Sequence, residues 1–412
     1  MNNWIQKNII KILSIFLVLG PIFDLITSVS INLFHLDIHI ILFIKIIFIF
    51  LLTYYSIFIY KGNNKKYIVI YYLLLGIYFI SYASNVVISK SIDVLFYECS
   101  YLFRTYFFPI CLINIYLVYE NKEKVSNKVL VISFIIYLLL LFIPFITNTG
   151  FDSYAYSKVG SIGWFNSTNE IGGILSILFP ITLSYLILKN KKIIPILLLV
   201  FFYVIFSIGS KVPVLTTLIT IIFFLILYLK KNSDKIKILI LPFIIIILLG
   251  TYLFPKTNFY KNIQIHLDFL EINSINDLLT FENIDHFIFS SRLKFLSETR
   301  NNYIKSDLKN HLIGIGYIEN YGTDEVNIKT IEMDYFDIFY RNGIIGFILF
   351  ITPMILVLIK LKPNKTIEIY CFVLALILAL FQGHILVSPS VSIYVIIILL
   401  NGGSYEKLLC YC

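Results

Sequence analysis

The stretch VLVISFIIYLLLLFIPFIT, residues 129–147, holds 19 residues and no charged side chain. A helix of that length rises about 30 Å, which matches the hydrocarbon thickness of a bilayer. Similar runs recur along the chain, which has 412 residues, 59% of them hydrophobic and 14% charged. One soluble core does not bury that much apolar material, so the sequence predicts an all-α polytopic membrane protein.

About twelve transmembrane helices are expected, and one long polar segment interrupts them. The spans lie near residues 9–27, 38–60, 67–88, 94–118, 129–147, 169–188, 193–208, 212–229, 238–254, 335–359, 367–386 and 388–402. We therefore predict four regions. These are an N-terminal five-helix region (1–147), a central membrane region (148–254), one large loop (255–334) and a C-terminal membrane region (335–412).

The positions of the basic residues predict which side each loop faces, because short cytoplasmic loops collect lysine and arginine. Of the 33 basic residues, 19 lie in the loops 61–66, 119–128, 189–192, 230–237 and 360–365 or at Lys7, Lys11 and Lys407. Both termini are thus expected in the cytoplasm and the 255–334 loop outside it. The net charge of +9 then reflects topology beside anionic membrane lipids, and we expect no nucleic-acid partner.

Cysteine and histidine usage predicts neither a disulfide in the loop nor a metal site. All five cysteines lie outside 255–334, and the six histidines show no spacing typical of zinc ligands. No cofactor is expected.

Charged residues within the predicted spans share one side of the membrane. Those in the outer halves are Asp24, Lys45, Glu98, Arg104, Glu170, Lys211, Asp337 and Arg341. Intramembrane charges usually face a polar cavity, so this asymmetry favours a cavity that is open to the outside. The alternative is snorkelling side chains and local ion pairs, which fits Arg104 least because it lies near the middle of its span.

Arginine is rare in this chain, with only four among 33 basic residues. Its planar fork holds phosphate or carboxylate at two points, so we expect it where a phosphate binds. Arg292 and Arg300 lie in SSRLKFLSETRNNYIKSDL (290–308), a predicted helix with Arg300 on its apolar stripe. The alternative is an amphipathic helix in which either arginine pairs with Glu298 or Asp307.

Acidic residues gather where the large loop leads into the next span, in IEMDYFDIFYRNGIIGF (331–347). Glu332 and Asp334 are candidates for a general base, because deprotonating a hydroxyl needs a carboxylate or histidine within reach. Capping by Asp334 and pairing of Asp337 with Arg341 are the structural alternatives.

A second polar segment, GSIGWFNSTNEIGGILSILFPI (160–181), leads into a middle span. Trp164, Asn166 and Asn169 suit the binding of sugar hydroxyls at a membrane surface. The alternative is that Thr168 or Asn169 caps the helix.

Several of these segments together resemble the O-antigen ligase and polymerase superfamily, which includes capsular and exopolysaccharide repeat-unit polymerases. The resemblance rests on GWFNSTNEIGG, on GSK (209–211) where the family usually has Ser-Arg, on GIGY (314–317) and on RNGIIGF (341–347). These segments occur in the family's order over residues 150–350. The chain departs from the pattern at EMD (332–334), where ligases of the family carry a histidine, and at Lys211.

The resemblance implies a GT-C-like membrane glycosyltransferase in a bacterial plasma membrane. Its substrate would be an undecaprenyl diphosphate-linked oligosaccharide, delivered by a flippase, with a chain-length regulator as a further possible partner. Diphosphate binding would fall to Arg292, Arg300, Lys211 and Arg104. Glu332 or Asp334 would replace the missing histidine, and no metal is implied.

The leading hypothesis is therefore a polymerase of lipid-linked repeat units for a surface polysaccharide such as capsule, O-antigen or exopolysaccharide. A ligase that moves finished glycan to another acceptor is the alternative within the class. A flippase or secondary transporter is the alternative from another class, but alternating access needs polar groups on both sides.

Overall fold

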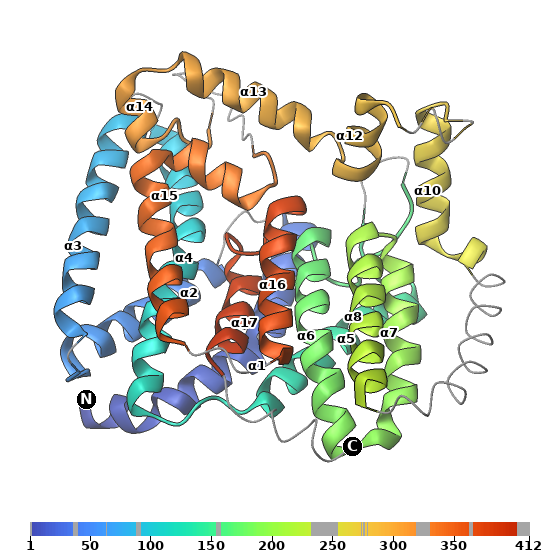
Figure 1. Ribbon diagram of the computed structural model, residues 1–412, viewed down its shortest axis with the longest axis horizontal. Helices are drawn as coiled ribbons and strands as arrows, with labels where there is room; N and C mark the ends of the chain where they lie inside the picture. The colour runs from blue at the N-terminus through green and yellow to red at the C-terminus, as the bar shows by residue number, and fades with distance from the viewer. Residues whose placement is uncertain are drawn as a thin grey trace. The chain divides into compact units, whose positions relative to one another are not determined.

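The computed structural model describes residues 2–35, 40–62, 64–87, 92–153, 158–231, 254–272, 274, 277, 279–318, 330–361 and 366–401. Within these ranges the regular structure is helical, apart from one isolated bridge between Asp152 and Ser161. The helices are α1 (Asn2–Phe34), α2 (Ile40–Tyr54), α3 (Lys65–Tyr82), α4 (Ile92–Asn121), α5 (Asn127–Thr147), α6 (Thr168–Lys189), α7 (Ile194–Ile208), α8 (Lys211–Lys231), α10 (Asn258–Phe269), α12 (Phe281–Phe289), α13 (Arg292–Lys305), α14 (Leu308–Ile313), α15 (Asp334–Lys360), α16 (Thr366–Phe381) and α17 (Pro389–Leu400) (Figure 1).

The chain forms two compact units that cut across the four regions expected along the sequence. The first unit contains residues 1–20, 39–130 and 284–412, and the second contains 21–38 and 131–283. Each unit has one helix with hardly any exposed surface, because that helix is apolar on all sides.

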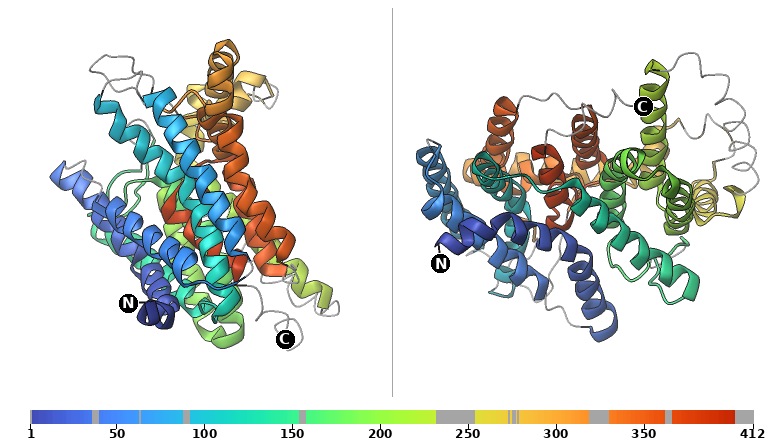
Figure 2. Two further views of the ribbon diagram at one scale, coloured as in Figure 1. Left: turned by 90° about the vertical axis from the view of Figure 1, so that its left-hand side faces the viewer. Right: turned by 90° about the horizontal axis from the view of Figure 1, so that it is seen from below.

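In the first unit the enclosed helix is α17, which packs against α4 and α16. Its side chains are buried almost throughout, as are 72% of the most apolar 18-residue window of α4. Helices α2 and α15 also pack on α4, and α3 packs on α15. Figure 2 shows α3, α4 and α15 running along one another.

Helix α15 is broken at Gly343, whose backbone lies in the left-handed region at φ 67°. A Cβ there would lie 2.6 Å from the amide nitrogen of Gly314, so only glycine allows this approach. The amides of Ile315 and Gly316 donate to the carbonyls of Tyr340 and Arg341 at 3.3 and 3.0 Å. The GIGY and RNGIIGF segments therefore meet, which explains why both need glycine.

In the second unit the enclosed helix is α6, of which 83% is buried over its most apolar window, and α7 and α8 pack against it. Ser167 caps α6 by accepting a hydrogen bond from the amide of Glu170 at 3.3 Å. The expectation of Thr168 or Asn169 as the cap is thus wrong by one or two positions. Thr168 instead donates its hydroxyl to the carbonyl of Ser153 at 3.1 Å.

The described residues include nine helices that are long and apolar enough to cross a membrane, in the ranges expected. Two further predicted spans correspond to the shorter apolar helices α16 and α17. The predicted span 238–254 lies outside the described residues except at its end. The predicted span 367–386 is too long, because α16 ends at Phe381 and residues 382–388 form a loop. Gly383 and His384, at φ 69° and 58°, turn the backbone out of the helix.

Within the segment 255–334 the structure contains α10, α12, α13 and α14. Helix α13 lies inside the range predicted as helical. The face that it buries includes Thr299 and Tyr303, whereas Ile304 and Arg300 are exposed. The predicted stripe that included Ile304 and Arg300 is therefore wrong, because the helix packs through a small hydroxyl side chain and an aromatic ring.

Candidate active site at the start of helix α15

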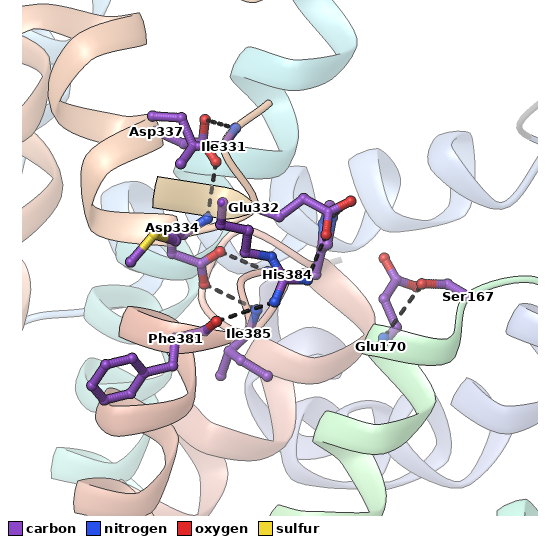
Figure 3. A network of polar contacts seen from close by, with 11 residues as sticks. Ser167, Glu170, Ile331, Glu332, Asp334, Asp337, Phe381, His384 and Ile385 are labelled. Carbon is purple, nitrogen blue, oxygen red and sulfur yellow. Dashed lines mark hydrogen bonds and ion pairs between the residues drawn. The ribbon is translucent and has the colours of Figure 1, made fainter. Parts of the chain in front are cut away.

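The start of α15 is fixed by Asp334, whose carboxylate is 1% exposed. It accepts backbone hydrogen bonds from His384, Ile385 and Leu386 at 2.7, 3.0 and 2.7 Å (Figure 3). These amides belong to the loop between α16 and α17, so Asp334 ties that loop to α15. A carboxylate that accepts three amides is well satisfied without solvent.

Glu332 lies two residues earlier and has a different environment. Its side chain is 40% exposed, and one oxygen accepts from Nη2 of Arg292 at 2.6 Å. The other oxygen lies 4.0 Å from Nε2 of His384. Glu332 itself is in the left-handed region at φ 59°. Such strain in a non-glycine residue is held only where its surroundings enforce it.

The backbone of Gly383 provides part of that enforcement. A Cβ at Gly383 would lie 2.4 Å from the carbonyl oxygen of Glu332 and 2.9 Å from its Cα. The two strained backbones therefore touch, and His384 follows directly after the contact. This places a carboxylate and an imidazole from segments about 50 residues apart on the same side of the site (Figure 3).

Arg292 is held from two sides at the first position of α13. Its Nη1 donates to the carbonyl of Phe381 at the end of α16, at 3.2 Å, and its Nη2 binds Glu332. The side chain is 12% exposed. Its buried Nε finds no hydrogen-bond partner among the described residues, so the guanidinium retains a donor for a ligand.

A buried network behind these groups holds α15 in register. Asp337 accepts from the amides of Ile331 and Met333 at 2.8 and 3.3 Å, which fixes the turn that carries Glu332. Arg341 is 1% exposed and donates to Thr299 Oγ1 at 3.1 Å and to the carbonyl of Gly316 at 3.2 Å. Both charged groups therefore contribute to positioning.

Glu98 performs a similar task from α4. Its buried carboxylate accepts the amides of Tyr317 and Ile318 at 3.0 and 2.9 Å and the hydroxyl of Tyr82 at 2.8 Å. This intramembrane charge is thus satisfied locally rather than by a cavity. Burial raises the pKa of the Tyr317 phenol, and the carboxylate of Asp337 raises that pKa further, so the phenol stays protonated at neutral pH.

The other arginines expected to bind diphosphate are placed differently. Arg104, on α4, is half-buried, and its guanidinium carbon lies 5.6 Å from the ring centroid of Tyr101. Tyr101 in turn stacks on Tyr317 at 4.9 Å between centroids. Arg300 is exposed on α13, eight residues after Arg292. The structure therefore brings Arg292, but not Arg300, to Glu332.

The remaining predicted site residues belong to the second unit. Trp164 donates through Nε1 to Thr149 at 3.2 Å, and the amide oxygen of Asn166 accepts from Asn32 at 3.4 Å. Asn169 is in the first turn of α6, and Lys211 is the first residue of α8.

His384 is the member of the site that the sequence interpretation missed. It was placed inside a predicted span and examined only for zinc spacing. The available signal was the break QGH (382–384) in an otherwise apolar run, since glycine followed by a polar residue interrupts a helix. Among the described residues, no group of three His, Cys, Asp or Glu side chains is arranged to hold a metal ion.

The helices and the site define a multi-pass α-helical membrane protein with a charged cluster where one of its long helices begins. The family described as O-antigen ligase like membrane protein matches residues 6–277 and 274–401, and the chain belongs to this family. The resemblance read from the sequence is thereby confirmed. No curated protein and no solved structure matches the chain.

Proposed function

We propose that this protein polymerises lipid-linked oligosaccharide repeat units at the extracytoplasmic face of a bacterial plasma membrane. The observation that carries the proposal is the cluster of Arg292, Glu332 and His384. It combines a fixed guanidinium with a spare donor and two partly exposed groups able to accept a proton. Membership of the O-antigen ligase-like family supports a glycosyl transfer of this kind.

In the proposed reaction, a hydroxyl of the incoming repeat attacks the anomeric carbon of the growing chain. A new glycosidic C–O bond forms while the bond from the anomeric carbon to the diphosphate oxygen breaks. Undecaprenyl diphosphate leaves with the bonding electrons, and the hydroxyl proton passes to a base on the protein. The diphosphate leaving group supplies the driving force, so neither ATP nor a nucleotide sugar is required.

Arg292 is assigned to the departing diphosphate, because a fixed cation stabilises charge that develops in the transition state. Its position is set by Glu332 and the carbonyl of Phe381 before any substrate binds. Arg104 and Arg300 remain proposed as additional phosphate contacts. In the second unit, Lys211 is proposed for the diphosphate and Trp164, Asn166 and Asn169 for the glycan.

For the base we favour His384 over the two carboxylates predicted from the sequence. Asp334 is buried and occupied by three amides, which favours a positioning role. Glu332 uses one oxygen for Arg292, and its other oxygen faces the imidazole. An imidazole oriented by a carboxylate is a common arrangement for removing a hydroxyl proton.

The central experiment compares Arg292→Ala with Lys294→Ala in cells that lack the native gene. Lys294 is an exposed cation two residues away on α13 and serves as the matched control. Surface glycan is resolved by gel electrophoresis, and lipid-linked intermediates are measured by mass spectrometry. We expect Arg292→Ala to leave single repeat units on lipid, with a loss of about 10²–10³-fold in rate, while Lys294→Ala makes normal chains.

The products distinguish the alternatives. Unchanged chain length in Arg292→Ala contradicts the proposal. Finished long chains that stay on the lipid carrier would indicate a ligase, and repeat units trapped on the cytoplasmic side would indicate a flippase.

A second comparison identifies the base. His384→Ala is expected to lower the polymerisation rate by about 10²–10⁴-fold, with a smaller loss in Glu332→Gln, which can still orient the ring. If Glu332→Gln is inactive and His384→Ala retains its rate, Glu332 itself is the base.

A further inference from the structure

An apolar groove lies along α3, α4 and α15, away from the candidate active site. Its volume is about 470 Å³, within the range of small-molecule pockets. The floor contains Ile68, Leu117 and Val357, which are 3%, 1% and 2% exposed, and the rim contains the exposed Leu74 and Ile348. Its lining on α15 begins at Ile348, 14 residues or about 20 Å beyond Asp334.

Two hydrogen bonds between α3 and α15 define the groove along its length. The Tyr71 hydroxyl donates to the carbonyl of Leu349 at 3.1 Å. At the end farthest from the active site, Lys360 donates to the side chain of Asn64 at 2.8 Å. The groove therefore combines an apolar channel with one cationic end.

The charges at that end favour an anion. Lys360 is exposed and lies 5.8 Å from the ring centroid of Tyr116, and an ammonium that makes one hydrogen bond keeps two further donors. Lys65 and Lys66 are exposed in the first turn of α3, directly after Asn64. The carboxylate that faces this cluster, Glu120, is engaged by the Tyr60 hydroxyl and, at 2.9 Å, by Asn64.

We propose that the groove is a binding site for an anionic phospholipid, with one acyl chain in the channel and the headgroup phosphate at Lys360. The apolar lining suits a hydrocarbon chain, and the surplus of cations suits a headgroup with net negative charge. Tyr67 and Tyr116, which line the same end, have the amphipathic rings typical of the membrane interface. The site does not depend on the proposed glycosyl transfer.

The test uses the full-length protein in detergent and native mass spectrometry. Phosphatidylglycerol and phosphatidylcholine with identical acyl chains are titrated separately, and bound lipid is counted. Lys360→Ala removes the cation, and Lys360→Gln keeps a donor for Asn64 if the alanine variant proves unstable. Leu74→Trp fills the groove from its rim. Matched controls are Lys189→Ala, an exposed lysine at the end of α6, and Leu199→Trp, an exposed leucine on α7.

We expect the wild type to retain phosphatidylglycerol in preference to phosphatidylcholine. Lys360→Ala and Lys360→Gln should lower phosphatidylglycerol affinity about five-fold without changing phosphatidylcholine, and Leu74→Trp should lower both. Equal retention of the two lipids by the wild type overturns the proposal, as does a Lys360 variant indistinguishable from Lys189→Ala. A dimer that Leu74→Trp abolishes while lipid binding stays unchanged would assign the groove to a second copy of the chain, which also overturns it.

Discussion

Gly383→Ala tests whether the contact between two strained backbones sets the geometry of the site. The new Cβ would lie 2.4 Å from the carbonyl oxygen of Glu332, which is 1.0 Å short of the 3.4 Å where ordinary contact begins. The residue also sits at φ 69°, which costs a non-glycine residue about 1–2 kcal/mol. We therefore expect the Glu332 backbone to shift by about 1 Å relative to Arg292 and His384.

A displacement of that size can cost about 100-fold in rate, because reacting groups must be held closely. The assay is polymerisation by purified protein in proteoliposomes, with lipid-linked repeat units as substrate and thermal unfolding measured on the same sample. Gly76→Ala is the matched control, because a Cβ there meets nothing within 4 Å. It should leave the rate unchanged.

Two results would separate the explanations. A folded Gly383→Ala protein with the rate of Gly76→Ala would refute the idea that this contact positions the site. A protein that loses its unfolding transition would show only that the loop is needed for folding. In that case, Gly383→Ser combined with partial activity at low temperature distinguishes the two effects.

Three other substitutions test the roles assigned to charged residues. Asp334→Asn puts an NH₂ group against three amide donors, so we expect a loss of about 2–4 kcal/mol in stability by thermal unfolding; an unchanged midpoint without activity would instead make Asp334 catalytic. Glu98→Gln removes a buried acceptor of two amides and a hydroxyl, so the midpoint should fall similarly; a normal midpoint would contradict the bonding described. Arg300→Ala should reduce polymerisation less than Arg292→Ala, because Arg300 is exposed, and an equal loss in the same assay would make it a second diphosphate contact.

Hydrophobic run length predicted most of the membrane helices, because spanning a bilayer needs a fixed number of apolar residues. It failed at the boundary between α16 and α17. There the apolar run continues through Ile385, Leu386 and Val387, while the backbone leaves the helix at Gly383. The amides released by that turn bind Asp334, a tertiary partner that hydropathy cannot indicate.

The candidate site was predictable only in part for the same reason. Glu332 and Arg292 stood out because charges are scarce in this chain and the segments containing them resemble the family. His384 did not, since its importance comes from the fold that places it 4.0 Å from Glu332. Arg292 and Arg300 looked equivalent in sequence, but α13 directs only the first toward Glu332.

The break in α15 has a consequence for the membrane around the protein. Residues 344–360 form a rod about 25 Å long, while residues 334–342 are fastened by Tyr78, which bonds the carbonyls of Asn342 and Ile313 at 2.9 and 3.2 Å. A helix adapts to bilayer thickness by tilting, and the flexible point at Gly343 lets the rod tilt without turning the part that carries the charged cluster. We therefore expect the turnover rate to vary little between thin and thick bilayers, and a steep dependence would contradict this view.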